Sequence, residues 1–143
     1  SWITILRKRE NYRRAFQGFD PAKVAAYDDD DVARLMADAG IIRNQAKIRS
    51  AINNANVFVE HFGDDEDAFS DFLWGFVGGE PIVNQRKTME DITVVTDAST
   101  EMSKALKKLG FTFIGPTTCY AMMQAAGMVD DHLVTCFRHT LNR

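Results

Sequence analysis

Two side chains near the end of the chain, His132 and Cys136, have a spacing that two ligands of one metal ion can have. They stand four residues apart in HLVTC, so one helical turn or a tight loop brings an imidazole and a thiolate to the same ion. Two ligands do not complete a tetrahedral zinc site, and the other candidates lack a matching spacing: Cys119, His61 and His139. Taken alone, the pair is better explained by a buried cysteine beside an unrelated surface histidine.

Two carboxylates, Asp130 and Asp131, come directly before His132. They can order the histidine through hydrogen bonds, as carboxylates beside metal ligands do, or they can form a polar turn. No Ser/His/Asp set, glycine-rich phosphate loop or pair of catalytic carboxylates stands out elsewhere in the sequence. The residue types alone therefore assign no catalytic group.

A second candidate site lies at about residues 32–52, where the pattern predicts two helices joined by a tight turn. Gly40 supplies the permissive backbone that a sharp turn needs, and Asn44 can cap the second helix. Such a turn leaves backbone N–H groups free at the start of the second helix, where they can bind phosphate. Basic residues lie beside them: Arg43, Lys47 and Arg49. The pattern fits a phosphate-binding hairpin or an ordinary turn between packed helices.

The apolar spacing along the rest of the chain predicts helices and no convincing sheet, so the predicted fold class is all-α. The predicted helices cover residues 1–19, 21–27, 30–37, 43–61, 68–77, 101–109 and 117–126. Asp20 and Pro21 form a helix start, and glycines end several of the helices. The aromatic stretch AFSDFLWGFV at 68–77 is interpreted as core, and 82–95 as an irregular connector.

The composition is that of an ordinary globular chain. Its 143 residues, 45% hydrophobic and 26% charged, predict one domain that buries roughly 70% of its unfolded surface. No apolar run reaches the ~20 residues of a membrane span. Two cysteines do not make a secreted disulfide framework, which favours a reducing cytoplasm. The net charge of −3 argues weakly against nucleic acid, but residues 1–14 are strongly basic.

The chain opens with SWITIL, which is apolar at once. Four residues there are predicted to form the middle of a buried helix: Trp2, Ile3, Ile5 and Leu6. An opening of this kind, without Met, is expected of a longer protein whose beginning precedes Ser1. Loss of a covering segment would expose these residues, so the chain is expected to self-associate, whereas the complete protein is expected to be a monomer.

Several ordered motifs resemble one family, DNA-3-methyladenine glycosylase type I. They are SWITILRKRENYRRAF at 1–16, FDPAKVA at 19–25, DAGIIRNQAKI at 38–48, DFLWGFV at 71–77 and SKALKKLGFTFIGPTTCYAMMQAAGMVDDH at 103–132. The resemblance therefore extends over nearly the whole chain, and several motifs in the same order are far more specific than any one of them.

The resemblance implies an all-α helix-hairpin-helix DNA glycosylase, here a single helical domain over 1–143. The family hydrolyses the N-glycosidic bond of 3-methyladenine in alkylated double-stranded DNA and does not cut the strand. The hairpin around Gly40 would then bind DNA, with Arg43 and Lys47 as phosphate contacts. Trp2 matches the tryptophan that stacks on the flipped base, although simple core packing would also explain an apolar residue there.

The resemblance also implies a structural zinc site, with His132 and Cys136 as two of its four ligands in the segment 127–143. The family's other two ligands and its pocket carboxylate, a Glu, are expected before Ser1, so this chain has no assigned catalytic residue and is expected to be inactive alone. The family shows Asn-Asp-His where this chain has Asp130-Asp131-His132. Two other interpretations stay open: a non-catalytic DNA-binding module, and a helical interaction domain without a nucleic-acid role.

Overall fold

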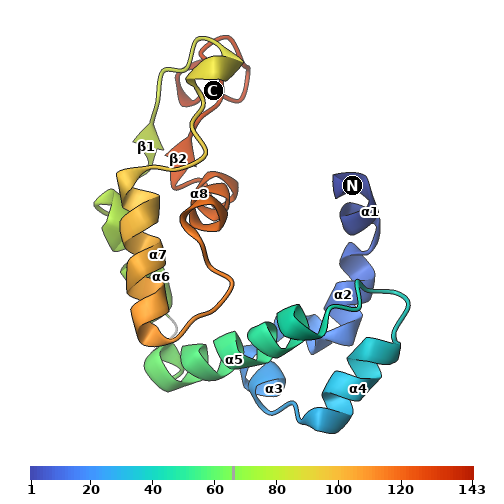
Figure 1. The fold of residues 1–143 in the computed structure, drawn as a ribbon. Coiled ribbons are helices and arrows are strands. Elements are labelled where there is room, and N and C mark those ends of the chain that lie inside the picture. Colours follow the sequence, from blue (N-terminus) through green and yellow to red (C-terminus); the bar gives the residue numbers. More distant parts are fainter. Residues whose placement is uncertain (66) are drawn as a thin grey trace. The chain divides into compact units, whose positions relative to one another are not determined.

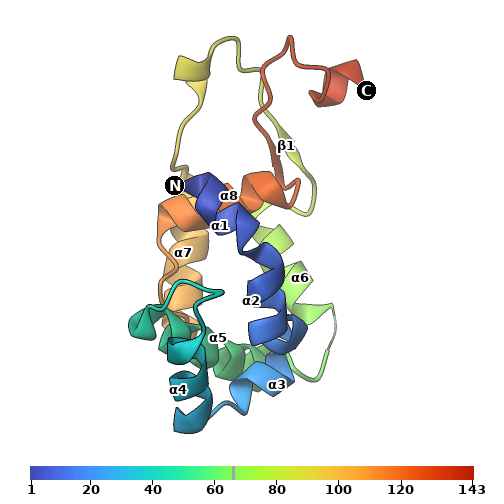
Figure 2. The same ribbon diagram turned by 90° about the vertical axis from the view of Figure 1, so that its right-hand side faces the viewer.

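The computed structural model describes residues 1–65 and 67–143, and most of the chain is helical (Figure 1 and Figure 2). This confirms the predicted all-α class. Contacts divide the chain into two compact units. The first unit is Ser1–Asp64 with Leu109–Phe113, and the second is Asp65–Lys108 with Ile114–Arg143. Among the described residues, no helix is both long and apolar enough to cross a membrane.

The first unit is built from short helices placed around one long one. Its elements are α1 (Trp2–Arg7), α2 (Arg9–Ala15), η1 (Gln17–Phe19), α3 (Pro21–Ala25), α4 (Asp29–Ala37) and α5 (Gln45–Phe62). Local sequence explains where α3 and α4 begin, since Asp20 and Asp28 are their N-caps and accept hydrogen bonds from backbone N–H groups of the first turn. α3 and α4 contact α5, and the core between the helices is apolar: Ala15, Phe16, Val24, Val32, Leu35, Ile41 and Ile48.

The predicted helix over residues 1–19 is broken twice, which the sequence did not indicate. Lys8 separates α1 from α2. Gly18 has a φ of +70° and leaves the helical conformation, so the last turn is a short 3-10 helix. The backbone therefore changes direction before Asp20 begins α3.

The first residues form the predicted helix, but its apolar side chains are exposed in this structure rather than buried, which is the state in which self-association was expected. Trp2 is 82% exposed and Leu6 is 59% exposed, and Ile3 and Ile5 are exposed as well. The reason is that α1 has its main contacts with α2 alone. The apolar periodicity of SWITIL therefore predicted the helix correctly but not the burial of its side chains.

A short segment from later in the chain, Leu109–Phe113, completes the first unit. Thr112 donates its backbone N–H to Asn54 Oδ1 at 2.8 Å, and Asn54 Nδ2 donates to the Thr112 carbonyl at 3.0 Å. Asn53 Nδ2 donates to the Gly110 carbonyl at 3.0 Å. Side chains of α5 thus replace the backbone partners that a strand or a helix would have supplied.

The second unit combines helices with a minimal sheet. Its elements are α6 (Ala68–Trp74), η2 (Gly75–Val77), β1 (Ile82–Val83), η3 (Met89–Asp91), α7 (Asp97–Leu109), α8 (Pro116–Ala125), β2 (Val129–Asp130) and η4 (Thr140–Asn142). β1 and β2 are parallel, with Ile82 opposite Val129. The expectation of no sheet is thus wrong in detail, because two-residue strands are too short to give a periodic pattern.

Two further differences concern helices of the second unit. α7 begins at Asp97, earlier than predicted, because Thr96 and Ser99 exchange side-chain-to-backbone hydrogen bonds of 2.9 and 3.2 Å across its first turn. No residue of α6 is fully buried, although its aromatic residues were predicted to be core. The fully buried apolar side chains of this unit come instead from α7, α8 and the segment that follows α8: Met102, Leu106, Cys119, Tyr120, Met123 and Met128.

Candidate functional site

The turn between α4 and α5 covers residues 38–44 and is held by its own side chains. Asp38 Oδ1 accepts the Gly40 N–H at 2.7 Å. Asn44 is the N-cap of α5, as predicted, and its Oδ1 accepts the Lys47 N–H at 3.0 Å. These two bonds fix the end of one helix and the start of the next, so the turn presents a defined backbone.

Gly40 is needed for a different reason from the one predicted. Its φ lies outside the left-handed region. A Cβ at this position would instead lie 2.8 Å from Asp38 Oδ1 and 3.2 Å from Asn11 Nδ2. The requirement for glycine is therefore the close packing of Asp38 and of Asn11 from α2 against this position, not backbone conformation.

Backbone donors and basic side chains do meet at this turn. Within the described part of the chain, the N–H groups of Arg43, Gln45 and Ala46 have no hydrogen-bond partner. The side chains of Arg43 and Lys47 are exposed, and neither forms an ion pair with another described residue. The start of α5 thus offers both components of the phosphate-binding seat that the sequence suggested.

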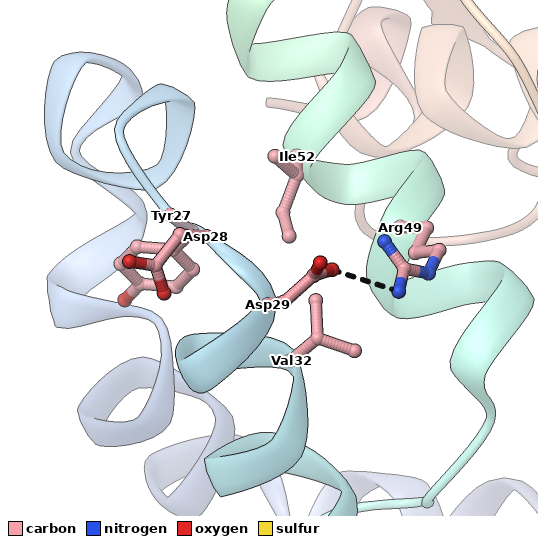
Figure 3. A pocket seen from close by; sticks show the side chains of 6 residues that line it. All are labelled: Tyr27, Asp28, Asp29, Val32, Arg49 and Ile52. Atoms are coloured by element: carbon pink, nitrogen blue, oxygen red, sulfur yellow. Dashed lines mark hydrogen bonds and ion pairs between the residues drawn. The ribbon is translucent and has the colours of Figure 1, made fainter.

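Arg49, the third basic residue of the pattern, is engaged elsewhere. Its Nη2 atom lies 3.0 Å from Asp29 Oδ1 at the start of α4. Figure 3 shows this pair across a cavity of about 300 Å³, which Tyr27 and Val32 also line. The local charge of Arg49 is balanced by Asp29, so Arg43 and Lys47 remain the two uncompensated cations of the turn.

A second cavity in the first unit, of about 460 Å³, lies between α1, α2, η1 and α5. Its lining is largely aromatic and aliphatic, and it includes Trp2, Phe19, Ile42 and Lys47. Trp2 is 82% exposed, so its indole is not packed into a core within this chain. The structure brings Trp2 and Lys47 to the same cavity, whereas Gly40 and Arg43 do not line it.

The proposed metal ligands lie close together on a loop of the second unit. His132 Nδ1 is 3.9 Å from Cys136 Sγ, and the Arg138 N–H donates to the same sulfur at 3.4 Å. Nitrogen and sulfur ligands of one tetrahedral zinc are roughly 3.5 Å apart, so the two side chains fit this role after a small shift. The described residues contain no group of three or more His, Cys, Asp or Glu placed to hold a metal.

The remaining predicted alternatives do not join this pair. Cys119 is buried, and burial raises the pKa of its thiol. His139 is also buried, and its Nε2 lies 2.8 Å from the Asn84 carbonyl while Nδ1 accepts the Leu141 N–H. Since Nδ1 accepts a hydrogen bond, Nε2 carries the ring proton and donates to the carbonyl, so both ring nitrogens have partners within the protein.

Asp130 organises the loop that carries His132 and Cys136. Its Oδ2 accepts bonds from the Thr140 N–H at 2.7 Å and from the Thr140 hydroxyl at 2.5 Å. Its Oδ1 accepts the His132 N–H at 3.1 Å. Burial raises the pKa of Asp130, but these bonds outweigh burial and hold the pKa at about 2. Asp130 thus orders the backbone of His132 rather than its imidazole.

Asp131 is the centre of a buried polar cluster that the sequence did not predict. Its carboxylate accepts hydrogen bonds from the side chains of Tyr120, Gln124, Asn84 and Arg86. Burial raises the pKa of Asp131, yet the bonds lower it below its ordinary value. No local motif could have indicated the cluster, because its partners lie 7 to 47 residues away in sequence.

Known proteins resemble this chain over almost its whole length. DNA-3-methyladenine glycosylase 1 of Escherichia coli (strain K12) is 52% identical over 136 residues, which are 95% of this chain and 72% of that protein. A crystal structure of 3-methyladenine DNA glycosylase I superimposes with a TM-score of 0.92 at 47% identity, covering 97% of this chain and 76% of the other.

A third comparison concerns the base itself. A structure that describes 3-methyladenine recognition by the Staphylococcus aureus enzyme has a TM-score of 0.88 at 39% identity, and it covers 95% of this chain and 72% of that one. The family profile of methyladenine glycosylase matches residues 1–139. The family suggested by the ordered motifs is therefore confirmed, and the chain belongs to the methyladenine glycosylase family.

Proposed function

We propose that this chain forms the DNA- and base-binding part of a 3-methyladenine DNA glycosylase. The reaction hydrolyses the N-glycosidic bond of the alkylated base in double-stranded DNA and leaves the strand intact. The observation that carries the proposal is the exposed indole of Trp2 beside an apolar cavity that also includes Lys47 of α5. A flipped base and the DNA backbone would then be bound by neighbouring residues.

Recognition of the base follows from its charge. An alkylated base must leave the stack before an enzyme can reach it, at a cost of a few kcal/mol. Adenine methylated at N3 is cationic, and an indole face attracts such a cation by up to ~2 kcal/mol when water is excluded. Trp2 can supply that face, and the aromatic walls of the cavity, including Phe19, can exclude water.

The turn between α4 and α5 is proposed to act as a helix-hairpin-helix element. The unpartnered N–H groups of Gln45 and Ala46 and the cations of Arg43 and Lys47 would bind consecutive phosphates. Such contacts carry no sequence information, which suits an enzyme that must examine damage in any sequence context. Gly40 shapes this turn, because a side chain at this position would meet Asp38 and Asn11.

Cleavage of the N-glycosidic bond requires less catalytic assistance than recognition of the base, because a cationic base is already a good leaving group. No residue of this chain is assigned as a general base. Asp130 and Asp131 are saturated by hydrogen bonds within the second unit and are not candidates. The pocket Glu that the family resemblance implies has no assigned counterpart among these residues.

His132 and Cys136 are proposed as two ligands of a structural zinc ion. When bound, zinc supplies a cross-link between chain segments and takes no part in bond cleavage. The N–H of Arg138 donates to the Cys136 sulfur and holds it in place on the loop. A cytoplasmic location is also proposed, and it is supported by two cysteines that are both free.

The test is chromatographic detection of 3-methyladenine released from methylated duplex DNA. The chain would be assayed alone and after fusion to the part of the Escherichia coli relative that lies outside the match. Release by either version supports the glycosylase, and release only by the fusion places essential groups in the added part. No release by either folded version overturns the enzymatic proposal.

The second candidate is a non-catalytic DNA-binding module, which the exposed turn with Arg43 and Lys47 favours. It predicts salt-dependent binding to methylated and unmethylated duplexes without base release by either version. Binding and release measured on the same samples therefore separate the two candidates.

A further inference from the structure

We propose that Asn11 and Tyr12 are positioning residues for DNA binding, which hold the turn between α4 and α5 at a fixed place relative to Trp2. The inference rests on the proposed function, because it concerns the turn that would bind phosphates. Neither side chain needs to touch DNA. Their role would be to keep two binding elements, the turn and the Trp2 indole, at a fixed distance from each other.

The face of α2 that meets the turn makes direct hydrogen bonds to its backbone. Asn11 Nδ2 donates to the Gly40 carbonyl at 3.1 Å, and the Tyr12 hydroxyl accepts the Ile42 N–H at 3.0 Å. Lys8 Nζ donates to the Ala39 carbonyl at 2.9 Å. The three side chains stand at i, i+3 and i+4, which is one face of a helix. They therefore bind three backbone groups within a four-residue stretch of the turn.

Asn11 and Gly40 also fit closely by shape. An added Cβ on Gly40 would lie 3.2 Å from Asn11 Nδ2 and 3.3 Å from Asn11 Cβ. The amide of Asn11 is fixed at its other end, since Asn11 Oδ1 accepts a bond of 2.5 Å from Arg14 Nη2. The donor is thus held in place before the turn meets it, which lowers the entropy cost of the contact.

The bonds from α2 also decide which backbone groups of the turn are left for a ligand. The carbonyls of Ala39 and Gly40 are engaged by Lys8 and Asn11. The groups that remain unpartnered nearby among the described residues include the N–H donors of Gln45 and Ala46. Carbonyl oxygens would repel a phosphate, and N–H donors attract it. The bonds from Lys8, Asn11 and Tyr12, here called the brace, therefore engage two carbonyls and one N–H of the turn and leave the N–H donors of Gln45 and Ala46 available.

The same helices connect the turn to Trp2. Lys8 is the single residue between α1, which carries Trp2, and α2, which carries the brace. Trp2, Tyr12 and Ile42 line one cavity, and the Tyr12 ring stacks on Phe16 with centroids 6.3 Å apart. A shift of the turn along α2 would thus change the distance between the turn and the Trp2 indole. A duplex with a flipped base can contact the turn with its phosphates and the indole with its base only at one such distance.

The test uses Asn11→Ala and Tyr12→Phe, which remove the bonds without changing charge. Matched controls are Asn56→Ala and Tyr27→Phe. Asn56 Nδ2 donates to the Ala25 carbonyl at 3.2 Å, and the Tyr27 hydroxyl donates to the Ala15 carbonyl at 3.2 Å. The controls remove side-chain-to-backbone bonds within the same unit but away from the turn.

Affinity is measured for a duplex with a tetrahydrofuran abasic site at several salt concentrations, and for free 3-methyladenine by calorimetry.

Each test variant should bind the abasic duplex roughly three- to tenfold more weakly than the parent, the equivalent of one lost hydrogen bond. The slope of affinity against salt should stay unchanged, because no phosphate contact is removed. Affinity of Asn11→Ala for 3-methyladenine should stay within about twofold of the parent, because Asn11 does not line the cavity beside Trp2. Amide exchange of Ile42 should accelerate in Tyr12→Phe and not in Tyr27→Phe.

Unchanged duplex affinity in both test variants would overturn the inference. An equal loss in the controls would also overturn it, because the effect would then be general destabilisation. If the parent itself shows no salt-dependent duplex binding, the proposed function fails first, and the parent measurement identifies that outcome without reference to any variant.

Discussion

The hydroxyl of Tyr120 donates a hydrogen bond to the carboxylate of Asp131 in the interior of the second unit. Burial and this bond raise the pKa of Tyr120 to about 12 from 10.0. Because the pKa is raised in the folded state, the contribution of the neutral Tyr120 hydroxyl to the free energy of unfolding is complete below pH 10. This contribution is lost as the pH rises toward 12. Ionisation of Tyr120 is therefore expected to lower the free energy of unfolding above pH 10.

Urea unfolding between pH 9 and pH 12 therefore tests the ionisation of Tyr120. We expect Tyr120→Phe to be less stable than the parent near neutral pH, because Asp131 loses a donor. Its stability should then fall less steeply above pH 10. Tyr27→Phe should keep the alkaline loss of the parent, and an identical alkaline loss in Tyr120→Phe would contradict this account.

Trp2→Ala should weaken binding of free 3-methyladenine roughly tenfold, from the loss of cation–π attraction. Binding of undamaged duplex should stay nearly unchanged, because the indole makes no phosphate contact in the proposal. Ile3→Ala is the matched control, since Ile3 is exposed on the same helix and does not line the cavity. Calorimetry that gives equal base affinity for Trp2→Ala and the parent would remove the stacking role.

Arg43→Gln and Lys47→Gln should each reduce the slope of log affinity against log salt by about 0.9, one released counterion per phosphate contact. Fluorescence anisotropy with a labelled duplex measures the slope. Arg49→Gln should leave it unchanged, because Asp29 already balances that charge. A reduced slope for Arg49→Gln and none for the other two would move the phosphate contacts away from the turn.

Cobalt(II) reports on the proposed metal pair, because a cobalt–thiolate bond absorbs in the near ultraviolet. We expect a thiolate band in the parent that disappears in Cys136→Ala and weakens in His132→Ala. Cys119→Ala should keep it, since Cys119 is buried away from the loop. Persistence of the band in Cys136→Ala would show that cobalt binds at another thiol.

Much of the helical framework could be predicted from local chemistry. Asp20 with Pro21 and the capping residue Asn44 mark helix starts that the structure confirms. The hairpin could be predicted for the same reason, since apolar spacing, Gly40 and a cap are all local signals. The family followed from motifs in a fixed order, which no single element would have revealed.

The missed features depend on contacts between distant residues. The apolar pattern around Trp2 is the same for a buried helix and for a helix beside an open cavity, so only the neighbours decide exposure. The cluster around Asp131 draws its donors from residues as distant as Asn84. The true reason for Gly40 was hidden as well, because it depends on Asn11 in another helix.

The connectivity of the first unit has a consequence for synthesis. Leu109–Phe113 belongs to that unit, yet more than forty residues of the second unit separate it from α5. While the ribosome is still making α6 and α7, Asn53 and Asn54 have no partners for the bonds they make to Gly110 and Thr112. The first unit can therefore be completed only after Phe113 has emerged, and an expression clone that stops at Asp64 would leave that side of α5 uncovered.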